Sequence, residues 1–354
     1  MKQFTSTLLF LFLVTPISLL SQDSIDVFIA NQMQQQRIAG LSLGIVKNGE
    51  IVKASGYGKA NIELNVPVSE KTVFKIASLS KQFIAVGILN LIHQGKLTLD
   101  TPVRNIIKNT PDSWKMMTIR HLLNHSSGLP EDPPAFDGMK SMPDSVYIAR
   151  AFKNKLASRP GTKFQYSNLG YYVLADIIRI VSHQSFSGYM KNNVFDPAGL
   201  KATRVTSVEA IVDNRASGYI EDSAQQIKNA PNYIAVRPSG AFLSNITDLL
   251  AWEKVMQESR IFDNHPSDTN LTGGFRTSLT MDGEPIYYRY GWMINRVGSH
   301  LLAHHGGSLP GFKSVYFRYP EEKTAIIILT NSDQTDAYAI AFGVAELLNK
   351  SMSN

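Results

Sequence analysis

The sequence predicts an α+β fold, in which an antiparallel sheet is flanked by helices from both ends of the chain and an all-helical lobe is inserted between the strands. Three observations predict it. Strand patterns occur in two distant groups, within residues 41–54 and 312–330. Helical spacing of apolar residues marks both ends of the chain, and it also runs through the middle. One lobe is therefore expected to contain both ends of the chain.

The composition is that of a globular protein. Of 354 residues, 44% are hydrophobic and 18% are charged, which excludes a disordered or fully membrane-embedded chain. The formal net charge is +6, but no basic run with interleaved aromatic residues is present, so we expect no nucleic-acid partner. The chain has no cysteine, which excludes disulfides, a lipid-modified cysteine and a thiol nucleophile. The oligomeric state is left open.

The first residues form a predicted secretory signal peptide. Lys2 precedes an apolar run over residues 8–20 that falls short of the roughly 20 residues needed to cross a bilayer. We place the signal peptide at residues 1–21, with cleavage near Ser21. The expected product is secreted or periplasmic, with no stable membrane insertion after cleavage; an uncleaved N-terminal anchor is the alternative.

Residues 22–354 are predicted to form a single catalytic domain. Its first helix covers residues 23–36, where apolar side chains recur at near-helical spacing. Extended segments at 41–46 and 50–54 follow, and Asn48 and Gly49 between them are typical of a hairpin turn. We assign residues 22–75 and 240–354 to an α/β lobe.

The middle of the chain, residues 76–239, is predicted to form the helical lobe. A strong helix pattern covers 76–94, and Gly95 follows at the position of a C-cap. Helical spacing then runs from residue 118 to about 189, interrupted by two segments rich in Gly and Pro.

The C-terminal part returns to strands and ends in a helix. Residues 312–319 and 324–330 are rich in Phe, Tyr, Val and Ile, which predicts a second hairpin. The last periodic segment, 337–348, predicts a helix that closes the chain.

The first chemical motif is Ser78 with Lys81, the sole Ser-x-x-Lys in the chain, at the start of the strong helix. Residues at i and i+3 project from the same face of a helix, so the two polar heads can meet. A lysine that burial keeps uncharged can remove the serine proton and activate its oxygen as a nucleophile. The alternative is a helix-capping serine beside a solvated lysine.

The second motif is Tyr166-Ser167-Asn168, at an expected loop-to-helix junction. A tyrosine near a lysine ammonium can have a lowered phenol pKa and relay a proton, while an asparagine amide can hold a substrate carbonyl. The alternative is a half-buried aromatic residue beside an N-capping asparagine.

The third motif is His305-Gly306-Gly307-Ser308, at the entrance of the late strand pair. Glycines allow a substrate to approach the backbone, and N–H groups there, with that of Ser78, can stabilise an oxyanion. The alternative is a Gly-rich hairpin turn with an incidental histidine.

The three motifs in this order resemble the serine β-lactamase and penicillin-binding protein superfamily, and most of all its class C-like branch with D-stereospecific peptidases and esterases. The resemblance implies that Ser78 is the acylated nucleophile and that Lys81 and Tyr166 share the proton transfers. It further implies that Asn168 contacts the substrate amide and that the N–H groups of Ser78 and Ser308 form the oxyanion hole.

His305 departs from the pattern of class C β-lactamases, which usually have lysine there. A histidine is mostly neutral at pH 7 and gains charge toward pH 6, so it weakens the case for a substrate carboxylate at this position. We therefore expect an exported serine hydrolase that acts on a D-amino-acid peptide or amide, or on a small ester. The alternatives are a class C-like β-lactamase and a penicillin-binding sensor that is acylated without turnover.

No metal or cofactor is expected. His121 and His125 have a spacing that can bind zinc on a helix, but the glutamate of the zinc-protease motif is absent because residue 122 is leucine. Gly56-Tyr57-Gly58 lacks the third glycine of a dinucleotide fingerprint.

Overall fold

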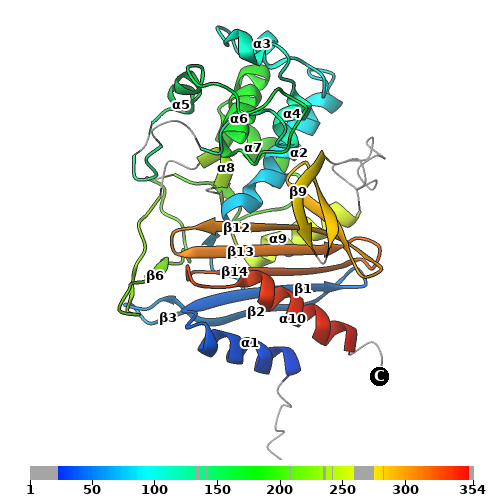
Figure 1. Ribbon diagram of the computed structural model, residues 1–354. Coiled ribbons are helices and arrows are strands. Elements are labelled where there is room, and N and C mark those ends of the chain that lie inside the picture. Colours follow the sequence, from blue (N-terminus) through cyan, green and yellow to red (C-terminus); the bar gives the residue numbers. More distant parts are fainter. Residues whose placement is uncertain are drawn as a thin grey trace, which may run out of the picture.

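The computed structural model describes residues 23–132, 136–140, 142–207, 209–233, 237–240, 242–258, 275–281 and 283–350. The predicted signal peptide lies outside these residues. A nine-stranded sheet forms the centre, with strand order β3-β2-β1-β14-β13-β12-β11-β10-β9 (Figure 1). All of its neighbouring strands pair antiparallel, which confirms the predicted fold class.

The strands of the central sheet come from both ends of the chain. They are β1 (Gly40–Lys47), β2 (Glu50–Asn61), β3 (Val66–Pro67), β9 (Phe275–Met281), β10 (Glu284–Arg289), β11 (Trp292–Val297), β12 (His300–Leu309), β13 (Phe312–Tyr319) and β14 (Thr324–Thr330). Two small sheets join β4 (Phe74–Lys75), β8 (Phe242–Ser244) and β5 (Arg204–Val205), and β6 (Tyr219–Glu221) with β7 (Ile227–Asn229).

The helices fall into two groups. Those that pack on the sheet are α1 (Ser24–Gln35), α9 (Ile246–Gln257) and α10 (Ala337–Lys350). The others are α2 (Ser80–His93), α3 (Val103–Ile106), α4 (Ile119–Leu123), α5 (Asp144–Ala151), α6 (Asn168–Ser182), α7 (Phe186–Met190) and α8 (Arg237–Gly240), with short turns η1 (Ala77–Leu79), η2 (Asp112–Trp114) and η3 (Lys191–Phe195).

Both predicted hairpins are confirmed. β1 and β2 pair across Asn48 and Gly49, whose φ angles of 53° and 86° are the left-handed values that a tight turn between twisted strands requires. β13 and β14 pair from Lys313 with Thr330 to Tyr319 with Thr324.

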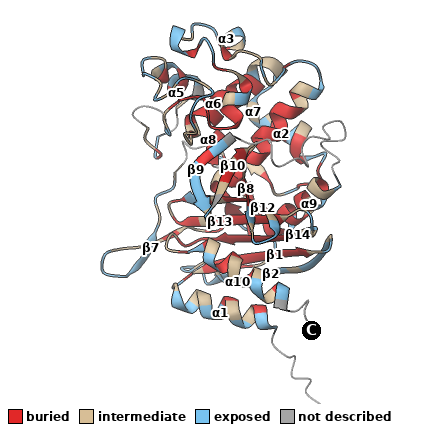
Figure 2. Cartoon of the chain, turned by 45° about the vertical axis from the view of Figure 1, so that its right-hand side comes forward, coloured by how far each residue is buried: buried red, intermediate tan, exposed pale blue. Residues whose placement is uncertain are grey.

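Side chains of the central strands alternate between two apolar layers, as the two-residue period of a strand requires. Ile326 and Ile328 of β14 pack with α1 and α10, while Ile327 and Leu329 pack on the opposite face with α9 and the helical region. Figure 2 shows the buried strands between these layers. Gly44 of β1 lets α9 lie against the sheet, since an added Cβ would come 2.8 Å from Ile246.

The inserted region contains the helices α2 to α8, but it is not all-helical as predicted, because the short strands β5, β6 and β7 also lie in it. α2 is buried on every side from Ser80 to Leu89, which explains why its sequence is apolar over more than one face. The strand patterns of β9, β10 and β11 were not assigned from the sequence, and neither was α9.

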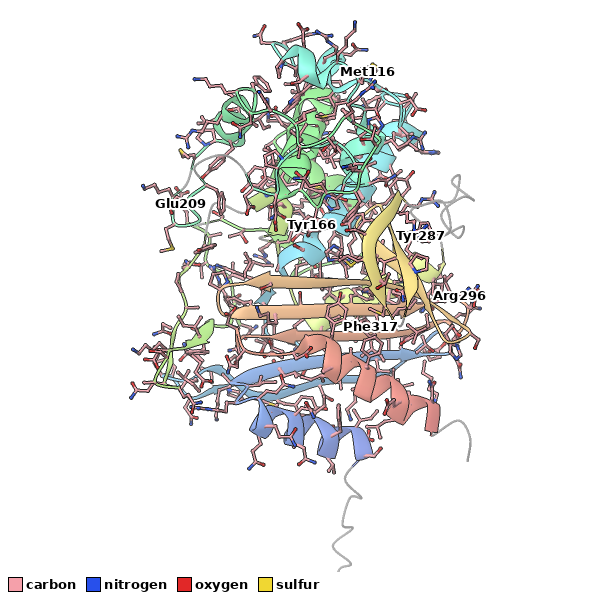
Figure 3. The ribbon with its side chains drawn as sticks, viewed as in Figure 1. Met116, Tyr166, Glu209, Tyr287, Arg296 and Phe317 are labelled. Atoms are coloured by element: carbon pink, nitrogen blue, oxygen red, sulfur yellow. The ribbon has the colours of Figure 1, made fainter. Side chains whose placement is uncertain are left out.

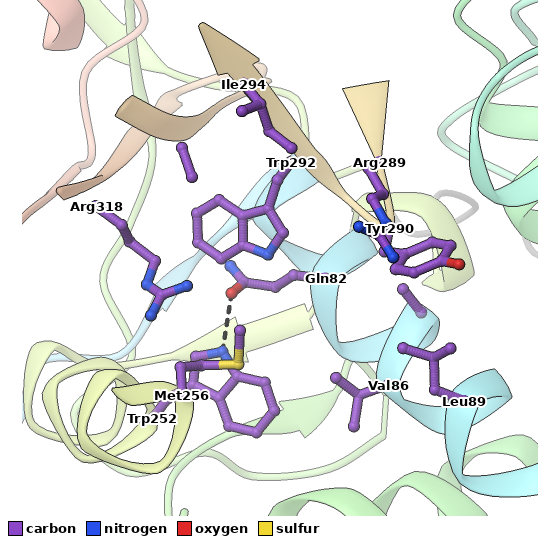
Figure 4. A pocket seen from close by; sticks show the side chains of 12 residues that line it. Gln82, Val86, Leu89, Trp252, Met256, Arg289, Tyr290, Trp292, Ile294 and Arg318 are labelled. Atoms are coloured by element: carbon purple, nitrogen blue, oxygen red, sulfur yellow. Dashed lines mark hydrogen bonds between the residues drawn. The ribbon is translucent and has the colours of Figure 1, made fainter. Parts of the chain in front are cut away.

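A buried ion pair joins α9 to the sheet. Glu253 Oε2 accepts hydrogen bonds of 2.7 Å from both Arg318 Nε and Tyr316 OH, and the two charged side chains are only 2% and 9% exposed. Beside it, Trp252 Nε1 donates to Gln82 Oε1 at 2.8 Å, and both side chains line a small cavity of about 50 Å³ (Figure 4). The ion pair thus links α9 to the sheet, and the second contact links α9 to α2.

We predict that Glu253→Leu lowers the free energy of unfolding by about 3–5 kcal/mol, because it leaves Arg318 buried without its partner. The double variant Glu253→Leu/Arg318→Met should lose less than the single one, since no charge then stays buried. Urea denaturation at pH 7 measures both. Asp100→Ala, which removes the exposed partner of Arg120, serves as the control and should cost below about 1 kcal/mol. A double variant that loses as much as the single one would contradict the prediction.

Candidate active site

Ser78 lies in the turn η1, immediately before α2. The turn is held by Ser80 Oγ, which donates to Ala77 O at 2.6 Å, and by Leu79 N, which donates to Ile76 O at 3.2 Å. Ala77 has a φ of 49° in the left-handed region, which a residue with a Cβ adopts at a cost of about 1–3 kcal/mol. The serine is thus presented on a strained turn that its surroundings hold in place.

Lys81 contacts Ser78, as the three-residue spacing predicted. Its Nζ donates to Ser78 Oγ at 3.0 Å, to Asn168 Oδ1 at 2.8 Å and to Ser239 O at 2.8 Å. The three acceptors are neutral oxygens from η1, α6 and α8, and the lysine is fully buried.

Burial lowers the pKa of the Lys81 ammonium to about 7, although the carboxylates of Asp132 and Glu131 oppose the shift. Removing the ammonium from water disfavours its charged form, and neutral acceptors restore only part of that loss. Near neutral pH a substantial fraction of Lys81 is therefore an uncharged amine, which can accept the proton of Ser78.

Tyr166 is the second group in contact with Ser78 Oγ. Its OH donates to Ser78 Oγ at 2.9 Å, and Lys81 Nζ lies 4.8 Å from the centre of its ring. Figure 3 places Tyr166 between the helical region and the sheet. The expectation of a lowered phenol pKa was wrong, because burial raises the pKa of Tyr166. Tyr166 can thus relay a proton as a neutral hydroxyl, while Lys81 is the group that can act as a base.

Asn168 is the first residue of α6, and it links Lys81 to the loop that contains Asp132. Its Oδ1 accepts from Lys81, and its Nδ2 donates to Asp132 Oδ1 at 2.9 Å. One amide hydrogen is left for a substrate carbonyl. The N-cap of α6 is Ser167 and not Asn168, since Ser167 Oγ accepts from Gly170 N.

An aromatic cluster behind Tyr166 was not found from the sequence. The ring of His125 lies 4.3 Å from those of Tyr166 and Tyr288, centre to centre, and its Nδ1 accepts from Ser167 N at 3.0 Å. Tyr288 OH in turn contacts His305 Nε2 at 3.1 Å. This cluster positions Tyr166, and its members come from loops and strands with no shared sequence period.

The third motif lies along β12, beside the turn η1 that contains Ser78. β11 pairs with β12 only as far as Met293 opposite His304, whereas β13 continues to pair up to Leu309. Within the described chain, residues 305–309 of β12 therefore have one edge without a strand partner. This geometry is compatible with backbone N–H groups that face a substrate.

Gly307 is required for β12 to approach the turn η1. A Cβ at this position would come 2.7 Å from Ile76 O and 2.9 Å from the Cβ of Ala77. Ser314 Oγ on the neighbouring strand donates to Ile76 O at 2.9 Å and fixes the same approach. Gly306 similarly allows the ring of Tyr338 to lie against the strand.

His305 lies in the site with Tyr166 and Tyr288, on the opposite strand face from His304, which contacts Tyr338 and Asn295. Burial lowers the pKa of His305 to about 3, and the positive charge of Lys81 acts in the same direction. The expectation that His305 gains charge toward pH 6 was therefore wrong. It is a neutral group throughout the range in which Lys81 titrates.

These residues line one cavity of about 560 Å³ between the helical region, the edge of β12 and the start of α10. Its lining consists of Ser78, Glu131, Phe164, Tyr166, Asn168, Leu279, Met293, His305, Gly306, Gly307, Ser308, Lys313, Ser314, Thr335, Asp336, Ala337 and Tyr338. Every residue of the predicted site except the fully buried Lys81 lines it.

Lys313 is a cation in this cavity that the sequence analysis missed. Its Nζ donates to Ser308 Oγ at 2.7 Å and lies 3.4 Å from Asp333 Oδ1. In the sequence Lys313 is distinguished only by its position five residues after Ser308. The pairing of β12 with β13 places the two residues directly opposite one another.

His121 and His125, which have the sequence spacing of a zinc site, are not arranged to bind zinc together. His121 Nδ1 accepts from Thr118 N, and His125 lies beyond the end of α4. The described residues include no group of three His, Asp or Glu side chains that could hold a metal ion. Within them, no helix combines the length and apolar character needed to cross a bilayer.

The family model described as Beta-lactamase matches residues 25–348. The chain belongs to the β-lactamase family. Protein flp of Staphylococcus aureus (strain COL) is 29% identical over 323 residues, which cover 88% of this chain and 63% of that protein. The chain thus spans less than two thirds of flp. Penicillin-binding protein 4* of Bacillus subtilis (strain 168) is 29% identical over 313 residues, covering 82% of this chain and 68% of that protein.

Solved structures of other proteins share the fold. An octameric penicillin-binding protein homologue from Pyrococcus abyssi superposes with a TM-score of 0.81 at 30% identity, covering 92% of this chain and 77% of that one. D-amino acid amidase from Ochrobactrum anthropi SV3, in its complex with D-phenylalanine, superposes with a TM-score of 0.79 at 24% identity, covering 93% of this chain and 98% of that one. At this identity the second likeness shows the fold alone.

We predict that kcat/KM for a neutral ester rises with pH and is half-maximal near pH 7, because the reactive form needs an uncharged Lys81 and burial lowers its pKa to about 7. At pH 6 the value should be about a tenth of its plateau. Lys81→Arg keeps a charge that does not titrate here, so it should abolish the activity. Rates between pH 5 and 9 give the midpoint. A rise centred above pH 9 would point to a base with an ordinary lysine or tyrosine pKa.

Proposed function

We propose that this member of the β-lactamase family is an exported serine hydrolase that forms an acyl-enzyme on Ser78 and hydrolyses a D-amino-acid peptide or amide, or a small ester. One observation carries the proposal. Ser78 Oγ accepts hydrogen bonds from both Lys81 Nζ at 3.0 Å and Tyr166 OH at 2.9 Å. A serine in contact with a buried amine and a phenol is arranged for activation as a nucleophile.

The reaction takes two steps. The uncharged Lys81 amine accepts the Ser78 proton, directly or through Tyr166 OH, while Ser78 Oγ bonds to the acyl carbon. The negative charge that forms on the acyl oxygen is stabilised by the backbone N–H groups of Ser78 and Ser308. As the bond to the leaving group breaks, Tyr166 or Lys81 protonates it. Water then attacks the ester and gives a proton to Lys81, directly or through Tyr166 OH; the bond to Ser78 Oγ breaks, the acid leaves, and the same proton passes to Ser78 Oγ.

The proposed substrate class rests on a neutral His305 and on the activities of proteins with the same fold. Because burial lowers the pKa of His305 to about 3, this position provides no cation for a substrate carboxylate at neutral pH. A neutral amide or ester is suited to such a surface. The fold occurs in the D-amino acid amidase of Ochrobactrum anthropi and in EstCE1, a hydrolase with promiscuous acyltransferase activity that superposes with a TM-score of 0.75 at 20% identity.

A second candidate is hydrolysis of a carboxylate-bearing substrate, such as a β-lactam or a peptide that ends in a D-amino acid. Lys313 favours it, since its ammonium lies in the same cavity and contacts Ser308. Both candidates proceed through an acyl-enzyme on Ser78 and differ only in the substrate.

We predict a single covalent adduct on Ser78 after exposure to a fluorophosphonate, and none in Ser78→Ala. Intact-mass spectrometry with peptide mapping detects it. Turnover is then measured on a nitrophenyl ester, a D-amino-acid amide, a D-Ala-D-Ala peptide and a chromogenic cephalosporin. An adduct on Ser308 or Ser126 would refute the assignment of the nucleophile, and an adduct with no turnover of any substrate would indicate the sensor.

We predict that Lys313→Met lowers kcat/KM for a D-Ala-D-Ala acid relative to its amide by about tenfold or more, the effect of one charge-assisted hydrogen bond. Lys313→Arg should retain most of the preference. In wild-type enzyme, the ratio of acid to amide turnover should be the same at pH 8 and pH 5.5, since His305 stays neutral. Equal losses for acid and amide would show that Lys313 only supports Ser308.

A further inference from the structure

A second cavity lies beside Lys75, which precedes Ser78 by three residues. It measures about 330 Å³ and is lined by Lys75, Arg215, Ala216, Ser217, Gly218, Asn229, Ala230, Pro231, Asn232 and Phe312. It shares no lining residue with the cavity of Ser78. Its two charged side chains are both cations, Lys75 and Arg215.

Lys75 is a buried cation that contacts only neutral groups. It is 4% exposed, and its Nζ donates to Asn232 Oδ1 at 2.6 Å and to Tyr233 O at 3.0 Å. The ring of Phe312 lies 5.8 Å from Nζ. Of the three ammonium donors, two are thus used and one is left for a further acceptor.

Arg215 adds a second positive charge to the lining of this cavity. Neither Arg215 nor Lys75 forms an ion pair with any carboxylate of the described residues. Burial lowers the pKa of Lys75 to about 8, and the charge of Arg215 contributes to this shift. The carboxylate of Glu63, which lies beside the cavity, accepts from Asn229 Nδ2 at 2.6 Å instead.

The walls of the cavity are closely packed, so it is a defined space. A Cβ on Gly218 would come 2.5 Å from the ring of Phe312, and one on Gly311 would come 2.5 Å from Ala230. The chain that leads into β6 therefore lies directly against the turn between β12 and β13 (Figure 1). Buried charges in proteins are normally paired, and two cations that face a preformed cavity are arranged to share one anion.

We infer that this cavity binds a small oxyanion, a carboxylate or a phosphate group, between Lys75 and Arg215. The bound anion accepts from the free donor of Lys75 and from the guanidinium of Arg215. Because Lys75 lies three residues before Ser78 and the adjacent Tyr233 packs near Ala77 and Leu309, binding also stabilises the loop behind the nucleophile.

The test measures the melting temperature of the full chain against increasing inorganic phosphate or acetate, with sodium chloride added to keep the ionic strength constant. We expect a rise that saturates with at least one of the two anions, and the more effective one identifies the preferred group. Ser78→Ala should respond like the wild type, which separates this site from the catalytic one.

Arg215→Gln and Lys75→Gln should each weaken the apparent affinity by about tenfold. Two variants that also remove one positive charge are matched controls: Lys313→Met in the catalytic cavity and the exposed Lys96→Gln. Both should keep the wild-type response. Lys75 is buried, so its variant can fail to fold, and the decisive variant is therefore Arg215→Gln. In Arg215→Gln, the rate at which a fluorophosphonate labels Ser78 should stay within twofold of the wild-type rate.

Three results would overturn the inference: no response beyond that to chloride, a response that persists in Arg215→Gln, or one that disappears in Lys313→Met. The last result would place the anion in the catalytic cavity.

Discussion

The burial of Lys81 is the constraint on which the site depends. A lysine in water is a poor base at pH 7 because it holds its proton. Here the ammonium is fully buried and contacts three neutral oxygens, from Ser78, Asn168 and Ser239. Neutral acceptors satisfy its hydrogen bonds without offsetting its charge, so burial lowers its pKa to about 7. A carboxylate in place of any one of them would stabilise the ammonium and remove the base.

This arrangement needs both layers of the molecule at once. The acceptors of Lys81 come from η1, α6 and α8, while the sheet holds the nucleophile turn from below through Ser314 Oγ and the bare backbone of Gly307. The left-handed φ of Ala77 is stable only because its neighbours hold the turn on both sides. α9 also supports this turn. Its Trp252 donates a hydrogen bond to Gln82 of the buried helix α2, which begins directly after η1. The stability of the fold and the geometry of the candidate site therefore depend on the same contacts.

The sequence predicted what local spacing controls. One helical turn brings Lys81 to Ser78, and Asn48 with Gly49 makes a hairpin, so both were predictable from a few residues. His125 and Tyr288 were missed because they meet Tyr166 only through the tertiary fold. The protonation of Tyr166 and His305 was misjudged for a related reason. Burial controls both pKa values, and a motif does not reveal how far its residues are removed from water.

The charges around Ser78 also bear on the transition state. Lys75 and Lys81 are both buried, flank Ser78 within seven residues of chain, and contact only neutral oxygens through their hydrogen bonds. In the proposed reaction, attack on an acyl group creates a negative charge beside Ser78, and Lys81 is again a cation after it accepts the serine proton. The pair of opposite charges then forms in a site of low polarity, where attraction is stronger than in water. The burial that lowers the pKa of Lys81 in the resting enzyme thus also strengthens the stabilisation of the oxyanion.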